Sequence, residues 1–252
     1  QEVVALDNID LEVEAGGFGA IVGPSGCGKS TLLRIMADLL PPSSGTVWIG
    51  DEPPRVARRS NGIGFVFQSA TQLPWRTVRR NIELPLDVVG HKAEHAGRAE
   101  ELIDLVGLNG FADALPSELS GGMQQRAAIA RALILKPQTL FLDEPFGALD
   151  EITRNHMNLE LLRIWSETAT TAMLVTHSIS EAVLMADKVF VMSARPGRIV
   201  KSLTIGLPRP RTLEMMRTDA FFVAENELRE ALYGSEVGTT PRPTAAQKRL
   251  SA

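Results

Sequence analysis

Hydrophobic residues follow two spacings along the chain, and segments of the two kinds alternate. Five short apolar runs predict buried strands at residues 18–22, 63–67, 139–142, 172–176 and 189–192. Two further strands are predicted, one from the alternation at 8–13 and one at 46–49. Helical spacing predicts helices at 29–40, 78–89, 94–106, 123–135, 152–167, 178–185 and 212–233. Strands and helices that alternate in this way favour parallel βαβ units and an α/β fold.

Length and composition fit one compact folded unit. The chain has 252 residues, of which 44% are hydrophobic and 22% are charged, and these fractions are close to globular averages. A chain of this length can bury one substantial core together with a subdomain. The stretch from Gly234 onward is rich in Thr, Pro and Ala, so we expect a flexible tail at 234–252.

Charge and cysteine content restrict the setting in which the protein works. The formal net charge of -4 disfavours nucleic acid as a partner. Cys27 is the single cysteine and cannot form an internal disulfide, which favours a reducing compartment. The sequence has no run of about 18 apolar residues, the length needed to span a bilayer. Residues 1–15 lack the order of a secretory signal, in which basic residues precede an apolar stretch. If the protein works at a membrane, we expect a partner to hold it there.

A glycine-rich segment lies between the strand predicted at 18–22 and the helix after it. It fits the pattern G-x-x-x-x-G-K-[ST] with Gly23, Pro24, Ser25, Gly26, Cys27, Gly28, Lys29, Ser30 and Thr31. Glycines let backbone N–H groups converge on an anion, and the helix N-terminus adds a favourable dipole. Lys29 is placed to reach the β- and γ-phosphates, and the Ser30 hydroxyl to ligate Mg²⁺. The segment predicts a nucleoside triphosphate site, and the alternative is a turn without a ligand.

Two carboxylates, Asp143 and Glu144, directly follow a buried apolar run. Ligands of open α/β sheets lie beyond the carboxyl ends of the strands, so both acids should face the phosphates. We expect Asp143 to hold Mg²⁺, through water, and Glu144 to orient or deprotonate the attacking water. The alternative is an ordinary strand-to-loop transition with solvated acids.

A second candidate anion site stands at the start of the helix predicted near residue 123. Ser120, Gly121 and Gly122 would offer backbone N–H groups and a hydroxyl there. Since one ATP already has its phosphates on the first loop, two such sites in one chain suggest a composite site. In it, this helix would cap the nucleotide that a second copy holds.

Six motifs, in this order, resemble those of the nucleotide-binding subunits of ATP-binding cassette (ABC) transporters. They are the loop at 23–31, Gln68, the segment 119–126, the pair Asp143 and Glu144, the segment 147–150 and His177. The resemblance extends to about Tyr233 and implies an ABC ATP-binding domain at 1–233. Its fold would be α/β, with a P-loop NTPase (RecA-like) core, an N-terminal antiparallel β subdomain and a helical subdomain at about 70–135.

The resemblance also implies roles for single residues. In that family, Gln68 would contact the metal or the attacking water and couple the site to a permease. Ser120 and Gly122 would touch the γ-phosphate across a dimer, and Asp150 would organise the interface between the two copies. His177 would contact the γ-phosphate and help to position the water. Taken alone, Gln68 could be a strand-end glutamine and His177 a core histidine.

Three segments, 73–82, 153–165 and 193–199, resemble one importer subgroup, which handles nitrate, sulfonates, taurine and similar small solutes. The resemblance implies an ATPase that uses ATP and Mg²⁺ and that pairs with a second copy of itself. It also implies transmembrane permease subunits, indirectly a solute-binding protein, and a peripheral place on the cytoplasmic face of the inner membrane. Trp75 would then be either a contact for the permease or a core residue.

Two other readings remain at this point. A soluble ABC-type ATPase of repair or translation usually carries long coiled-coil insertions or two cassettes, and neither is visible in the sequence. A regulatory module that only binds nucleotide would lack the catalytic groups, whereas Glu144 and His177 are both present.

Overall fold

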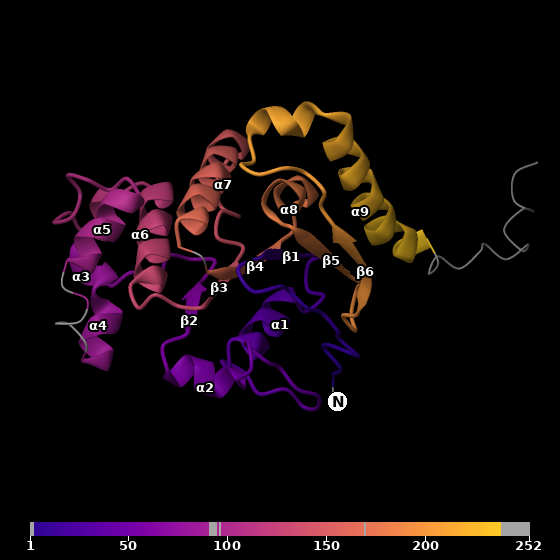
Figure 1. Ribbon diagram of the computed structural model, residues 1–252, viewed down its shortest axis with the longest axis horizontal. Helices are drawn as coiled ribbons and strands as arrows, with labels where there is room; N and C mark the ends of the chain where they lie inside the picture. Colours follow the sequence, from indigo (N-terminus) through magenta and orange to yellow (C-terminus); the bar gives the residue numbers. More distant parts are fainter. Residues whose placement is uncertain (1–2, 91–94, 96, 169, 238–252) are drawn as a thin grey trace, which may run out of the picture.

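A computed structural model describes residues 3–90, 95, 97–168 and 170–237. Among these residues, six strands form one sheet in the order β2-β3-β4-β1-β5-β6 (Figure 1). The strands are β1 Phe18–Val22, β2 Ile63–Val66, β3 Thr139–Asp143, β4 Thr171–Thr176, β5 Lys188–Met192 and β6 Ile199–Thr204. Neighbouring strands run parallel except for β5 and β6, which are antiparallel. The expected α/β fold is confirmed.

Helices cover both faces of this sheet. They are α1 Lys29–Met36, α2 Pro54–Arg59, α3 Val78–Ile82, α4 Leu84–Val89, α5 Arg98–Leu105, α6 Gly121–Leu133, α7 Glu151–Ser166, α8 Ile179–Met185 and α9 Asp219–Val237. In Figure 1, α7, α8 and α9 lie on one side of the sheet and α1 and α2 on the other. No helix of the described residues is long and apolar enough to cross a bilayer.

The central strand β1 shows why the start of the glycine-rich loop at 23–31, called the phosphate loop below, is fixed in place. All five of its residues are buried, because both faces of the sheet are covered. Phe18, Ala20 and Val22 join a core shared with α6 to α9, whereas Ile21 joins a second core with Leu33 of α1. Because successive side chains of a strand point to opposite faces of the sheet, β1 is packed on both sides. The phosphate loop begins at the end of this fixed strand.

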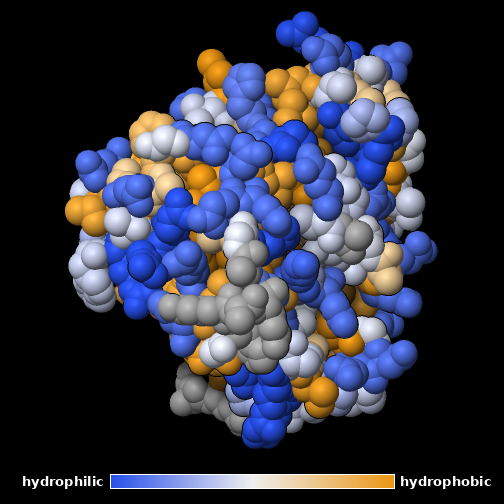
Figure 2. All heavy atoms as spheres, turned by 60° about the vertical axis from the view of Figure 1, so that its left-hand side comes forward, coloured by the Kyte–Doolittle hydropathy of each residue, from blue (hydrophilic) through white to orange (hydrophobic). Residues whose placement is uncertain are grey.

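The helices α3 to α6 gather at one end of the molecule, beyond β2 (Figure 1). Their contacts with one another and with β2 link this group to the sheet, chiefly through α6. The surface seen from this end is mostly hydrophilic, with hydrophobic residues showing between the polar ones (Figure 2). Such a mixture is ordinary for a protein surface.

The two strands expected near the N-terminus are not regular strands. From Asn8 to Val13 the side chains do alternate between exposed and half-buried, and Ile9, Leu11 and Val13 pack on the second core. Only isolated bridges form in this region, between Leu6 and Gly197 and, for the segment at 46–49, between Ile49 and Glu52. The alternation at 8–13 therefore predicted correctly which side chains are half-buried. Within the part of the chain that the structure describes, no neighbouring strand pairs with the backbone of 8–13 or of 46–49, so neither segment forms a regular strand.

Two expected helices are shorter or broken, and local backbone chemistry explains both. The helix predicted at 29–40 ends at Met36, because Asp38 adopts a left-handed φ of 56°. The helix predicted at 78–89 is split into α3 and α4 at Glu83. Pro85 has no N–H to donate to a carbonyl one turn earlier, which favours a break at this point.

At the C-terminal end the expected helix at 212–233 is a 3₁₀ turn, Leu213–Arg217, followed by α9. Thr218 separates them, and its Oγ1 accepts a hydrogen bond of 3.3 Å from the N–H of Phe221 at the start of α9. Because α9 continues to Val237, the first four residues of the expected tail are helical. Residues 238–252 of that tail lie outside the described residues, as do residues 91–94 and 96 around the start expected for the helix at 94–106. The short α2 and the strand β6 were not predicted.

Candidate nucleotide-binding site

The glycine-rich loop connects β1 to α1, and its glycines are required for two reasons. Gly26 and Gly28 have φ values of 75° and 108°, which side-chain-bearing residues rarely adopt. Gly23 is required by close packing, because a Cβ there would lie 2.9 Å from the carbonyl oxygen of Met192. The loop can therefore hold its backbone N–H groups in a tight curve ahead of α1.

Lys29 lies inside this curve. Its Nζ donates to the carbonyl oxygens of Gly23 at 2.8 Å and Pro24 at 3.0 Å, and the residue is only 6% exposed. No carboxylate of the described residues pairs with this ammonium within 4.0 Å. A buried cation held only by carbonyl dipoles favours the approach of an anion.

Asp143, at the end of β3, lies next to the start of α1. Its Oδ1 accepts a hydrogen bond of 2.7 Å from Ser30 Oγ, and its Oδ2 lies 3.8 Å from Nη2 of Arg34. The carboxylate is buried, with 5% of the side chain exposed. A hydroxyl and a carboxylate oxygen at this spacing suit Mg²⁺, which prefers oxygen ligands and keeps several waters. The described residues hold no cluster of three or more His, Cys, Asp and Glu that would bind a metal alone.

Glu144 contacts the other two residues predicted for catalysis, His177 and Gln68. Its Oε2 lies 3.3 Å from Nδ1 of His177 and accepts a long 3.5 Å contact from Nε2 of Gln68. Glu144 has a φ of 45°, a left-handed conformation that is costly for this residue type. Its backbone N–H is nevertheless bonded to the carbonyl oxygen of Val175 at 2.9 Å. The fold thus keeps an unfavourable backbone conformation that points this carboxylate toward Gln68 and His177.

Strand register explains why these residues meet. Val22 of β1 is level with Thr176 of β4, and Val175 of β4 is level with Asp143 of β3. The residues that follow, Gly23, His177 and Glu144, therefore emerge side by side at the carboxyl edge of three adjacent strands. Ligands of open parallel sheets bind at such an edge.

The Ser120–Gly122 segment lies elsewhere. Ser120 caps α6, with its Oγ accepting from the N–H of Met123 at 3.3 Å, and both Ser120 and Gly121 are exposed. Within the described part of the chain, no hydrogen bond joins this segment to the phosphate loop. Further along α6, Gln125 donates to the carbonyl oxygen of Phe67, the residue before Gln68, at 3.1 Å. The exposed N-terminal turn of α6 is thus available to a second molecule.

Asp150 caps the start of α7 in the same manner. Its Oδ1 accepts a 3.0 Å hydrogen bond from the N–H of Thr153, which lowers the pKa of this exposed carboxyl. One turn later, Arg154 donates to the carbonyl oxygens of Phe146 at 3.3 Å and Leu149 at 2.6 Å. The loop between Glu144 and α7 therefore ends at Asp150, and Arg154 holds two of its carbonyl groups.

Sequence reasoning missed two charged residues near the site. Arg34 follows Ser30 by one helical turn, a spacing that would have placed it on the same face of α1. Glu181 is 7% exposed, bonds to the hydroxyl of Thr176, and lies one helical turn beyond His177. Burial raises the pKa of Glu181, while the hydrogen bond from Thr176 and the charge of Arg154 oppose this effect.

Comparisons with known proteins agree with this geometry. The ABC transporter family matches residues 6–147. The chain is 43% identical over 245 residues to the nitrate import ATP-binding protein NrtD of Synechocystis, covering 94% of this chain and 91% of that protein. It is 44% identical over 210 residues to the aliphatic sulfonates import ATP-binding protein SsuB of Bacillus cereus, covering 83% and 82%.

A solved structure shares the fold as well. It is a dimeric ATP-binding cassette in a post-hydrolysis state bound to ADP and Pi, with 34% sequence identity and a TM-score of 0.69. The match covers 81% of this chain and 92% of that one. Taken with the loop, the acidic pair and the family match, this similarity shows that the chain belongs to the ABC transporter family, as one of its ATP-hydrolysing ATP-binding proteins.

Proposed function

We propose that this protein powers an importer for a small anionic or zwitterionic solute such as nitrate, a sulfonate or taurine. The observation that carries the proposal is the joint emergence of Gly23, Glu144 and His177 at one edge of the sheet. The names of the relatives support import over the alternative, a soluble ABC-type ATPase not coupled to transport. Since both relatives cover most of the chain, the support extends beyond the phosphate loop.

In this proposal the loop at 23–31 binds the phosphates of ATP, and Lys29 contacts the β- and γ-phosphates. Ser30 and Asp143, with Gln68, would hold Mg²⁺, which neutralises phosphate charge during transfer. Glu144 orients or deprotonates the attacking water, and its contact with His177 keeps both groups on the same side of the site. His177 and Gln68 then fix the direction from which the water attacks.

The nucleotide site is completed by a second copy. Ser120, Gly121 and Gly122 are exposed or half-buried at the start of α6 and, among the described residues, form no hydrogen bond with their own phosphate loop. In a pair of copies, each would present this helix start to the γ-phosphate held by the other, with Asp150 at the interface. Hydrolysis therefore depends on closure of the dimer, which would pull on the membrane partner.

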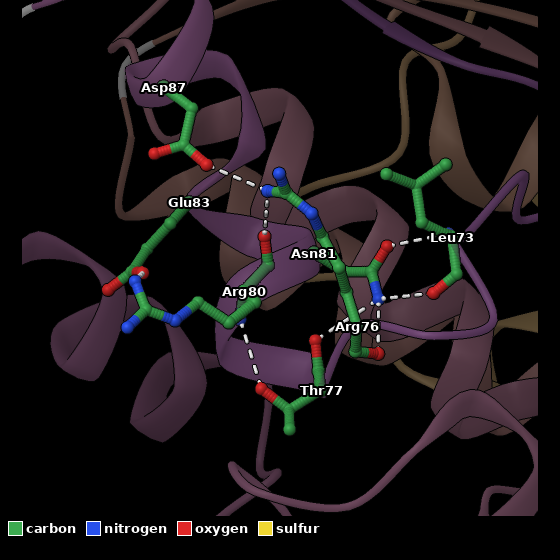
Figure 3. Close-up of polar contacts among 7 residues, drawn as sticks. All are labelled: Leu73, Arg76, Thr77, Arg80, Asn81, Glu83 and Asp87. Carbon is green, nitrogen blue, oxygen red and sulfur yellow. Dashed lines mark hydrogen bonds and ion pairs between the residues drawn. The ribbon is translucent and has the colours of Figure 1, made fainter.

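A permease is the proposed membrane partner, and the loop before α3 is a suitable contact. Trp75 is 73% exposed there. The loop is organised by Asn81, a buried residue whose Oδ1 accepts from the N–H of Leu73 at 2.7 Å (Figure 3). Its Nδ2 donates to the carbonyl oxygens of Leu73, Arg76 and Thr77 at 2.9 to 3.1 Å. A rigid loop that exposes a large aromatic ring is typical of an interface anchor.

With the permease as anchor, the protein would lie on the cytoplasmic face of the membrane, and a solute-binding protein would act on the other side. The test is ATPase activity of the chain reconstituted in vesicles with its permease and solute-binding protein. We expect stimulation by one solute among nitrate, taurine and an aliphatic sulfonate, and none with Glu144→Gln. If the complex assembles but none of the solutes changes its ATPase rate, the result would favour the alternative of a soluble ATPase not coupled to transport.

A further inference from the structure

The turn between β5 and β6 packs against the outer side of the phosphate loop. Gly197 of this turn is buried, and a Cβ there would lie 2.3 Å from the carbonyl oxygen of Cys27. A side chain at Gly197 is therefore excluded by the loop itself. At the tip of the same turn, Nη2 of Arg195 donates a 3.1 Å hydrogen bond to the carbonyl oxygen of Gly26. Two consecutive carbonyls of the phosphate loop thus face this turn.

The turn is held in place by its own bonds and by the N-terminal segment. Ser193 closes it, since its N–H donates to the carbonyl oxygen of Arg198 at 2.9 Å and its Oγ accepts from the N–H of Arg198 at 3.1 Å. Arg198 also pairs with Asp7, through Nε at 3.0 Å. The N–H of Asp7 bonds to the carbonyl oxygen of Gly197 at 3.0 Å, and Figure 1 shows the N-terminal segment beside the β5–β6 turn.

The contact at Gly26 has a consequence for the inner side of the loop. In a trans peptide the C=O and the N–H point in opposite directions, so a Gly26 carbonyl held by Arg195 turns the N–H of Cys27 inward. This N–H and Nζ of Lys29 share one acceptor, the carbonyl oxygen of Pro24, at 3.4 and 3.0 Å. Both donors therefore point to the same carbonyl, on the side of the Gly26–Cys27 peptide opposite to Arg195, and we expect a phosphate oxygen to bind on that side.

We propose that Arg195 is a positioning residue for ATP binding, and that the Ser193–Arg198 turn supports the phosphate loop from behind. Arg195 holds the Gly26–Cys27 peptide with its N–H inward, and its charge adds attraction for the phosphates. Gly197 allows the turn to approach. The inference rests on ATP binding at residues 23–31, and it adds a support that none of the loop's own residues provides.

The first test measures ATP hydrolysis by the full chain with Arg195→Ala, Arg195→Lys and a matched control, Arg229→Ala, on the exposed face of α9. Loss of one charge-assisted hydrogen bond should raise KM for ATP about tenfold and leave kcat within about twofold. Arg195→Lys should recover most of the affinity. An unchanged KM in Arg195→Ala, or the same rise in Arg229→Ala, would overturn the proposal.

The second test needs no hydrolysis, so it separates this inference from the proposed function. Cys27 is the single cysteine of the chain and is 1% exposed, so its labelling by a small maleimide reports opening of the phosphate loop. We expect Arg195→Ala to label about tenfold faster than the wild type without nucleotide, and Arg229→Ala to label at the wild-type rate. Equal rates in all three proteins would contradict a supporting role, even if ATP hydrolysis proceeds as proposed.

Discussion

Ser30 Oγ donates a 2.7 Å hydrogen bond to Oδ1 of Asp143, a residue 113 positions further along the chain. This bond joins the start of α1 to the end of β3, and so joins the phosphate loop to the acidic pair. Two motifs that were recognised separately in the sequence therefore form one site. Ser30 is also held by the loop that precedes it in the chain. Asp143 has a second contact, with Arg34, whose Nη2 lies 3.8 Å from its Oδ2.

Replacement of Ser30 by alanine should weaken the response to metal. The variant loses one of the two oxygens proposed for Mg²⁺, so the Mg²⁺ concentration for half-maximal hydrolysis should rise about tenfold. The measurement is ATPase rate against Mg²⁺ at saturating ATP. Ser43→Ala, at an exposed loop position, is the matched control and should behave as wild type. An unchanged Mg²⁺ requirement in Ser30→Ala would exclude its hydroxyl as a ligand.

Glu144→Gln should abolish turnover and spare nucleotide binding. Gln keeps the shape and hydrogen bonds toward Gln68 and His177 but cannot accept a proton, and general-base catalysis is worth about 10²–10⁴-fold. Steady-state hydrolysis and the Kd for ATP are measured side by side. Glu230→Gln, exposed on α9, is the control. If Glu144→Gln hydrolyses ATP at the wild-type rate, Glu144 is not the base.

Asn81→Ala should destabilise the protein and weaken its complex with the permease. Removing this buried amide leaves the part-buried N–H of Leu73 without its acceptor and three carbonyls without a donor, at a cost of about 3 kcal/mol. For a chain of this size, calorimetry should show a fall in Tm of roughly 6–12 °C. Trp75→Ala is the counterpart: it should keep the wild-type Tm and lose permease binding. Normal assembly of Trp75→Ala would remove Trp75 from the interface.

Glu181→Gln should change the dependence of stability on pH. Burial raises the pKa of Glu181 above its ordinary value of 4.5, so the folded state binds this proton more tightly than the unfolded state. The stability that Glu181 contributes is then present below pH 4.5 and is lost as the pH rises through the raised pKa. The variant cannot ionise, so its Tm relative to wild type should increase from pH 4 to pH 7. A constant difference, as expected for Glu230→Gln, would contradict the raised pKa.

Much of the fold followed from hydrophobic spacing, because a buried parallel strand such as β3 is centred on an uninterrupted apolar run, here residues 140–142. The predictions that were wrong concern places where strand pairing or a single backbone angle determines whether an element forms and where it ends. Residues 8–13 alternate as a strand does but lack a partner strand, and the left-handed Asp38 ends α1 early. Neither a missing partner nor a positive φ at an aspartate is visible in hydrophobic spacing.

The site was predicted motif by motif, but its contacts were not. The order of strands, with β3 and β1 on either side of β4, brings Glu144 and His177 together, and sequence spacing does not reveal that order. Arg195 carried no chemical signal, because its contact with Gly26 crosses 169 residues. The roles of Ser120, Gly122 and Asp150 depend on a second molecule, so they remain proposals.

The central claim is that ATP held on one phosphate loop is completed by the Ser120–Gly122 segment of another copy. Light scattering of Glu144→Gln, with and without Mg-ATP, tests it most directly when Gly122→Asp is added. A Cβ at Gly122 meets only Met157, at 3.8 Å, and one at the control position Gly206 meets nothing within 4 Å, so both variants should fold.

We predict that Mg-ATP doubles the mass of Glu144→Gln, and does so equally when Gly206→Asp is added. With Gly122→Asp the mass should stay that of a monomer although ATP still binds, because the new carboxylate would face the γ-phosphate of the partner. A dimer that forms as well with Gly122→Asp, or a Glu144→Gln protein that stays monomeric at saturating Mg-ATP, would contradict the composite site.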